Sequence, residues 1–184
     1  MRGAAGSFGI ATSFTMNTFA SPLEATVFSY NWHLSASDAA SFLKAFQDFA
    51  LNSNVPPELG IEIVLTKAEV RGNVSVGLAG GWYAPLASLN ATLAPFFSKV
   101  PEPRAASFDT GSYLHSATNL AGGSLDTTSA PDGTDTFYAR SLMTPVHQPM
   151  SAEAIQGLMD VVSTEGFDML VVCFRWFFPL HFAL

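Results

Sequence analysis

The sequence contains a single cysteine and few charged side chains in its 184 residues. One cysteine can neither close a disulfide within the chain nor build a thiolate zinc site. Charged residues make up 12% of the chain, about half the usual share of roughly 25%. Eight Lys and Arg stand against fifteen Asp and Glu, which gives a net charge of −7. We therefore expect no nucleic-acid partner, because too few cations are present to neutralise phosphates.

The two ends of the chain are where a signal peptide or a membrane anchor would lie. The start, MRGAAGS, is followed by no apolar run of the kind that a signal peptide needs, so none is predicted here. Residues 167–184 read FDMLVVCFRWFFPLHFAL, an apolar tail that Asp, Arg, Pro and His interrupt. A spanning helix needs about 20 apolar residues. We therefore expect no membrane span; the first part of the tail fits a buried strand, and the rest is atypical for the end of a domain.

Between the ends, the hydrophobic pattern changes between the period of a strand and that of a helix. Alternating or β-branched runs predict strands, and apolar residues at helical spacing predict helices that Ser caps. Residues 101–136 read mainly as loop, with one helical turn near Tyr113. We expect an α+β fold, a mainly antiparallel sheet that helices cover on one face. The predicted strands are residues 8–21, 23–32, 59–70, 73–83 and 136–142, and the predicted helices are residues 35–51, 85–99 and 151–163.

Few residues point to chemistry. Glu62 is a charge inside an apolar strand, on the face opposite Ile61 and Ile63 by the two-residue period. It fits either a solvated outer face or a carboxylate that lines a ligand groove. Aromatic residues could stack on a sugar ring, although in so apolar a chain they usually belong to the core. The four histidines are scattered, and we predict no metal site and no catalytic triad. The aromatic candidates are Trp82, Tyr83, Tyr113 and Tyr138.

Two further motifs carry a physical meaning. The segment RGAAGSFG at residues 2–9 is rich in glycine, which lets backbone N–H groups approach a ligand closely. It is neither a Walker loop nor a dinucleotide fingerprint. Asn73-Val74-Ser75 and Asn90-Ala91-Thr92 are N-glycosylation acceptor tripeptides, which fit a secreted protein without establishing one.

A family resemblance joins several of these segments. RGAAGSFGIATSFTMNTF resembles the segment R-G-(G/A)-G-x-(N/S)-F-G-I-V-T-x-F of FAD-linked oxidases of the berberine bridge enzyme type, part of the vanillyl-alcohol oxidase-like flavoprotein superfamily. Within that family the chain looks most like the fungal glucooligosaccharide oxidases. The similarity continues through AFQDFALNSNVPPELGIEI, DTFYARSLMTP and SAEAIQGLMD, and it covers residues 2–165.

The resemblance implies an internal piece of a longer protein. Residues 1–12 would be the C-terminal remnant of an FAD-binding domain, residues 13–165 a partial substrate-binding domain, and residues 166–184 the atypical apolar tail. The missing FAD domain would be the natural packing partner. Glu62 and Tyr113 are the candidates for substrate contact, and no residue is assigned as catalytic. The residues implicated in flavin contact are Gly3, Ala4, Ala5, Ser7, Gly9 and Ile10.

The activity that the resemblance implies is FAD-dependent oxidation of a carbohydrate or similar alcohol, with oxygen as acceptor, in a secreted protein. These 184 residues would then be a truncated and inactive piece of it. The single cysteine, Cys173, stands in the wrong place to be the one that often tethers the flavin. Two other interpretations stay open, a non-catalytic carbohydrate-binding module and a small tail-anchored membrane protein that uses residues 169–184.

Overall fold

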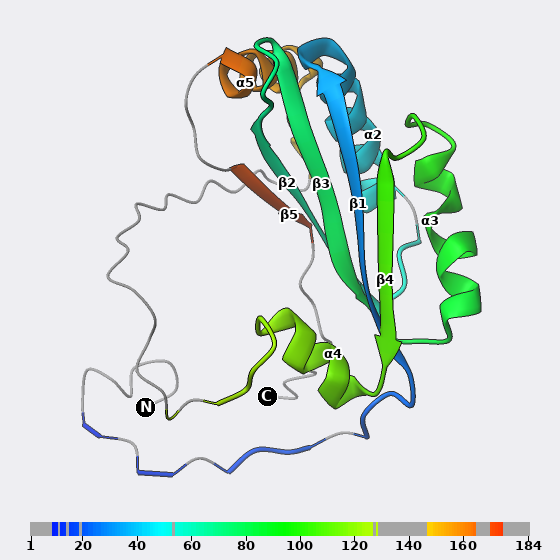
Figure 1. The fold of residues 1–184 in the computed structure, drawn as a ribbon, viewed down its shortest axis with the longest axis vertical. Helices are drawn as coiled ribbons and strands as arrows, with labels where there is room; N and C mark the ends of the chain where they lie inside the picture. The colour runs from blue at the N-terminus through cyan, green and yellow to red at the C-terminus, as the bar shows by residue number, and fades with distance from the viewer. Residues whose placement is uncertain are drawn as a thin grey trace.

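The computed structural model describes residues 9–10, 12–13, 15–18, 20–52, 54–126, 128, 147–164 and 170–174. They form an α+β fold with one antiparallel sheet, in the strand order β4-β1-β3-β2-β5 (Figure 1). This confirms the fold class expected from the hydrophobic pattern. The elements are β1 Ala25–Ser35, α2 Ala36–Asn52, β2 Leu59–Lys67, β3 Asn73–Trp82, the 3-10 helix η1 Leu86–Ser88, α3 Leu89–Phe97, β4 Ala105–Gly111, α4 Tyr113–Leu120, α5 Ala152–Thr164 and β5 Leu170–Phe174.

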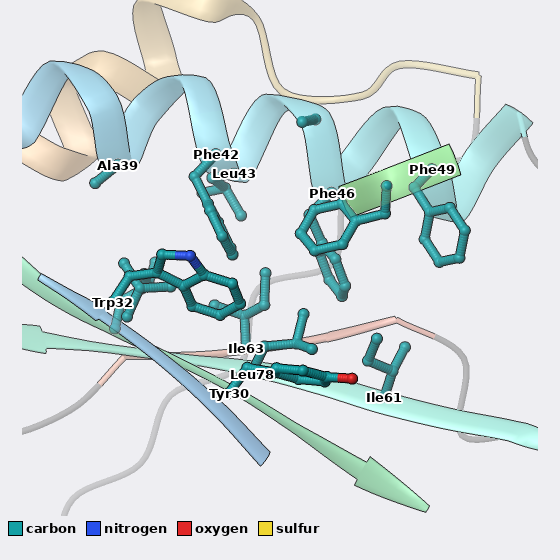
Figure 2. Close-up of a cluster of buried hydrophobic side chains, with 14 of the residues drawn as sticks. Tyr30, Trp32, Ala39, Phe42, Leu43, Phe46, Phe49, Ile61, Ile63 and Leu78 are labelled. Carbon is teal, nitrogen blue, oxygen red and sulfur yellow. The ribbon is translucent and has the colours of Figure 1, made fainter. Parts of the chain in front are cut away.

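Helices α2, α3 and α5 cover one face of this sheet. Alternate residues of the strands point toward them, as in β2, where Ile61, Ile63 and Leu65 are buried while the residues between them are half-buried. Helix α2 turns its phenylalanines onto the strands (Figure 2). Trp32 meets Phe42 edge to face, with ring centroids 4.7 Å apart. Burying each such side chain stabilises the fold by about 1.5–3 kcal/mol.

The predicted helix caps are confirmed for two helices. The Ser35 hydroxyl accepts a hydrogen bond from the backbone N–H of Asp38 at 3.2 Å, at the start of α2. The Ser151 hydroxyl accepts one from the N–H of Ala154 at 3.1 Å, at the start of α5. Each bond satisfies an N–H that the first helical turn leaves without a partner. Ile155 on α5 is fully buried against the same core as α2, as its spacing predicts.

Strands β2 and β3, both predicted from the sequence, form a hairpin. The two strands pair antiparallel, from Lys67 opposite Val74 to Leu59 opposite Trp82. Gly72 lies in the connecting turn with a φ of 86°, a conformation that costs glycine little and other residues more. The N–H of Asn73 donates to the carbonyl of Val70 at 3.0 Å and closes the turn.

Three expectations are wrong. The described residues between 8 and 21 form no strand, and all of them are exposed in spite of the alternating pattern. Residues 105–111, expected to be loop, form β4; its exposed side chains lack the apolar alternation that marks a buried strand. Near Tyr113 a single helical turn was expected, but the structure has the eight-residue helix α4.

Some expectations fall outside the described residues. These are the strand at residues 136–142, with Tyr138, and the atypical end at residues 175–184, with His181. The strand predicted in the first part of the tail is confirmed for β5, which pairs antiparallel with β2. Within the part of the chain that the structure describes, no helix is long and apolar enough to cross a bilayer.

Candidate functional site

The candidate site lies on the sheet face that α2, α3 and α5 leave open, here called the open face. Of the described helices only α4 lies beside it, at the end where β1 begins and β4 ends (Figure 1). The open face is floored by small or short side chains, whereas large apolar ones fill the opposite face. The floor residues are Val27, Ser29 and Asn31 of β1, Gly77, Ala79 and Gly81 of β3, Gly60 and Val64 of β2, and Ala105 and Ser107 of β4.

Glu62 lies on the open face, on a strand that has a neighbour on each side. It stands on β2 opposite Ala79 of β3, and Ala79 is in turn opposite Ser29 of β1. On its other side the backbone of Glu62 is opposite Cys173 of β5. Glu62 is half-buried. Its placement on the face away from Ile61 and Ile63 is the one that the two-residue period predicted.

Tyr113 stands at the end of the open face, on the first turn of α4. Its ring lies 6.0 Å from that of Tyr83, between centroids, with 49° between the planes. The Tyr83 ring lies over Gly81, where an added Cβ would come within 3.0 Å of the Tyr83 hydroxyl, so glycine gives the ring its place. Burial, and then the neighbouring Tyr113, raise the pKa of the Tyr83 phenol above 10.0. Tyr83 therefore stays protonated at neutral pH and is a hydrogen-bond donor.

An acid–histidine pair borders the same end of the open face. His115 Nε2 lies 2.8 Å from Asp109 Oδ1, and the Asn119 amide donates to Asp109 Oδ2 at 2.6 Å. Ser112 caps α4 by accepting the N–H of His115 at 3.2 Å, which sets the position of the imidazole. The hydrogen bond from His115, then that from Asn119, lower the pKa of Asp109 below 3.8. The pair presents a carboxylate that stays charged to low pH.

Sequence reasoning missed Asp109, His115 and Asn119. A partial signal was present, because Ser112 is a good cap and a helix that begins at Tyr113 places His115 and Asn119 one turn apart on one side. Asp109 gave no signal, since its strand looked like loop. His33, by contrast, lies 3.1 Å from the guanidinium of Arg104. In the described part of the chain, no group of three or more His, Cys, Asp or Glu side chains could hold a metal ion.

The structure describes only part of the predicted flavin-contacting segment. Gly9 and Ile10 are exposed, Ile10 to 94%. A Cβ added at Gly9 would have no atom within 4 Å, so no described part of this chain requires glycine there. Gly3, Ala4, Ala5 and Ser7 lie outside the described residues.

Because its pKa is lowered, Asp109 should link the α4–β4 contact to pH. The ionised carboxylate is favoured in the folded chain, so the contact is fully stabilised above the ordinary pKa of 3.8 and loses this stabilisation as the pH falls through the lowered value. We expect His115→Ala to raise the pKa of Asp109 toward 3.8, because the largest cause of the shift is removed. Carboxyl-carbon NMR titration measures this directly.

The matched control for that titration is His33→Ala, which removes another exposed histidine, one that lies beside Arg104. It should leave the Asp109 titration unchanged. An Asp109 pKa that does not move in His115→Ala would contradict the assigned pairing.

Comparison with known proteins identifies relatives that are oligosaccharide oxidases. The chain is 27% identical over 161 residues to the xylooligosaccharide oxidase of Thermothelomyces thermophilus, which covers 84% of this chain and 30% of that protein. It is 25% identical over 169 residues to the chitooligosaccharide oxidase of Gibberella zeae, covering 90% of this chain and 32% of that protein. No family model matches the chain.

Solved structures of the same kinds of oxidase share the fold of this chain. The glucooligosaccharide oxidase of Acremonium strictum superposes with a TM-score of 0.65 at 25% identity, over 82% of this chain and 30% of that one. A berberine bridge enzyme variant shares the fold, with a TM-score of 0.53 at 16% identity over 80% of this chain and 29% of that one. The chain therefore spans about a third of the length of its curated relatives, and within that span it is similar to FAD-linked oxidases of the berberine bridge enzyme and glucooligosaccharide oxidase type.

Proposed function

We propose that this chain supplies the sugar-binding sheet of an FAD-dependent carbohydrate oxidase, and that these 184 residues alone turn over no substrate. The observation that carries the proposal is the open face itself, in a chain whose relatives are oligosaccharide oxidases. A floor of Gly, Ala and Ser leaves room for a flat ligand, while a carboxylate and two tyrosines offer groups that recognise sugars. For the whole protein we also propose secretion.

The spacing of these groups favours an oligosaccharide over a single sugar. Along β3, Glu62 is level with Ala79, and Tyr83 stands four residues further on. At about 3.3 Å per residue the two lie about 13 Å apart along the sheet. That span exceeds one pyranose ring. A sugar chain could therefore stack one ring near Tyr113 while another donates hydroxyl hydrogen bonds to Glu62.

FAD is the cofactor that the resemblance of the glycine-rich segment implies. Of that segment the structure describes Gly9 and Ile10, and both are exposed. Gly3, Ala4, Ala5, Ser7, Gly9 and Ile10 remain the residues proposed to border the flavin. The chemistry that FAD supplies when bound is acceptance of hydride from an alcohol carbon. The described residues of this chain would bind and orient the sugar. Holding the reacting groups close together in this way lowers the activation barrier of the oxidation.

The test measures the binding of chitooligosaccharides and xylooligosaccharides to the purified chain by NMR titration. We expect weak but saturable binding, which Glu62→Gln weakens further by about tenfold because a hydrogen bond to a charged group is worth about 1.5–3 kcal/mol. Tyr113→Ala should also weaken it, because a stacking surface for a sugar ring is lost. Val161→Ala is the control, because Val161 is exposed on α5, which packs on the other face. Equal affinity in all three variants would exclude the open face as the sugar site.

The same titration separates the proposal from its main alternative. Saturable binding with micromolar affinity in the absence of flavin would favour a self-sufficient carbohydrate-binding module. Weak binding, which tightens only when the rest of the oxidase is present, would favour the partial substrate domain proposed here.

A further inference from the structure

We propose that Asn90 is an N-glycosylation site of this protein and that Asn73 is not. The two acceptor tripeptides, Asn73-Val74-Ser75 and Asn90-Ala91-Thr92, are equivalent as sequence signals. They differ in their position in the fold. This inference rests on the proposed secretion but not on the oxidase activity, since it concerns a surface that the sugar-binding proposal does not use.

Asn90 is placed where a bulky polar group can leave the protein. It is the second residue of α3 and is exposed, whereas its neighbour Leu89 and the next core-facing residue, Leu93, are fully buried. The helix is thus fixed to the core by one side and presents Asn90 on the other. Thr92, the third residue of the tripeptide, donates its hydroxyl to the Ser88 carbonyl at 3.0 Å, within the same turn.

A groove beside Asn90 gives the first sugar a surface to lie on. It has a volume of about 240 Å³, and its lining includes Phe97, Val100, Pro101 and Glu102. An N-acetylglucosamine ring has an apolar side and polar substituents, so such a mixed surface suits it. Helix α3 lies across the sheet from the open face, so a glycan here would leave the open face accessible (Figure 1).

Asn73 occupies a more confined position. It is half-buried at the first residue of β3, where its backbone pairs with Ser35 of β1. Its carbonyl accepts the N–H of Ala68 at 3.2 Å, and its own N–H closes the hairpin turn. The residue that follows, Val74, is fully buried. A glycan of many sugars must stay in water, and this site between paired strands gives it less room than the surface of α3.

The modification is a transfer of an oligosaccharide from a lipid-linked diphosphate donor in the secretory pathway. The bond that forms joins C1 of N-acetylglucosamine to the side-chain nitrogen Nδ2 of Asn90. The bond that breaks is the one between C1 and the diphosphate oxygen of the donor. The lipid diphosphate leaves with both electrons of that bond, and the amide nitrogen gives up one proton.

The experiment translates the full chain behind a cleavable secretory leader in the presence of microsomes. Only the fraction that microsomes protect from added protease is analysed, so every molecule scored has met the glycosylation machinery. We expect one glycan per chain, seen as a single mobility step that peptide-N-glycosidase removes. Peptide mass spectrometry should place it on Asn90.

Three variants decide the site. Asn90→Gln should abolish the mobility step, Thr92→Ser should keep it because serine preserves the acceptor tripeptide, and Asn73→Gln should leave it unchanged. A protected chain without glycan, or with the glycan on Asn73, would overturn the proposal. None of these readouts depends on sugar or flavin binding, so failure here and failure of the proposed function are distinguishable.

Discussion

A purified preparation of these 184 residues is expected to show no flavin absorption and no oxidation of oligosaccharides. The chain corresponds to 30% and 32% of the two oxidases that it resembles in sequence. Gly9 and Ile10, two of the residues proposed to border the flavin, are both exposed in this structure. Without a hydride acceptor the reaction loses its catalysed route, a loss on the order of a millionfold or more.

Visible absorption spectra and peroxide release with chitooligosaccharides and xylooligosaccharides measure both parts of this prediction. The glucooligosaccharide oxidase of Acremonium strictum, whose flavin is described as a 6-S-cysteinyl, 8α-N1-histidyl FAD, serves as the positive control. Flavin retained at one equivalent per chain through gel filtration would show that the 184 residues hold the cofactor by themselves, against our proposal.

The second large effect is expected from one glycine of β3. In Gly80→Ala the new Cβ would overlap the backbone oxygen of Gly60 and lie 2.9 Å from Cζ of Phe28. Because β3 is paired with β1 on one side and β2 on the other, its backbone cannot move away. Overpacking of this kind costs about 1–3 kcal/mol. That is a large fraction of a total stability of about 5–15 kcal/mol.

Gly77→Ala on the same strand is the matched control. Its Cβ would meet the Asn31 side chain at 3.7 Å and the Val64 carbonyl at 3.8 Å, both ordinary van der Waals contacts. Both substitutions restrict the unfolded chain equally, which favours the folded state by about 0.4–1 kcal/mol. Urea unfolding should therefore show a lower midpoint for Gly80→Ala and an unchanged or higher one for Gly77→Ala. Equal midpoints would mean that the sheet relaxes at Gly80.

Much of the fold could be predicted because its signals are local. The alternation in β2, the Ser35 cap and the helical spacing of the phenylalanines in α2 are each contained within a few residues. Strand β4 could not be predicted in this way. Its residues are exposed along most of the strand, so no apolar pattern marks it, and it is a strand because β1 offers it a free edge.

For the candidate site, the face on which Glu62 lies could be predicted from the sequence, while its role stays a proposal. Glu62 was placed on the correct face from its period alone, since Ile61 and Ile63 are buried and it is not. The surroundings of Tyr113 could not be derived, because they depend on pairings between distant segments. Asp109 comes to the open face only through the register of β4 with β1, where it stands opposite Val27.

The central position of β1 also has a consequence for the order of folding events. Thr26 bonds to Thr110 across 84 residues of chain, whereas Lys67 and Val74 in the β2–β3 hairpin are separated by 7 positions, from 67 to 74. Each doubling of loop length adds about 0.6 kcal/mol of closure entropy, so the β1–β4 loop costs about 2 kcal/mol more to close than the hairpin. Strand β1 can pair only after β3 and β4 have been synthesised. We therefore expect the β2–β3 hairpin to form first and β1 to pair with β3 before it pairs with β4.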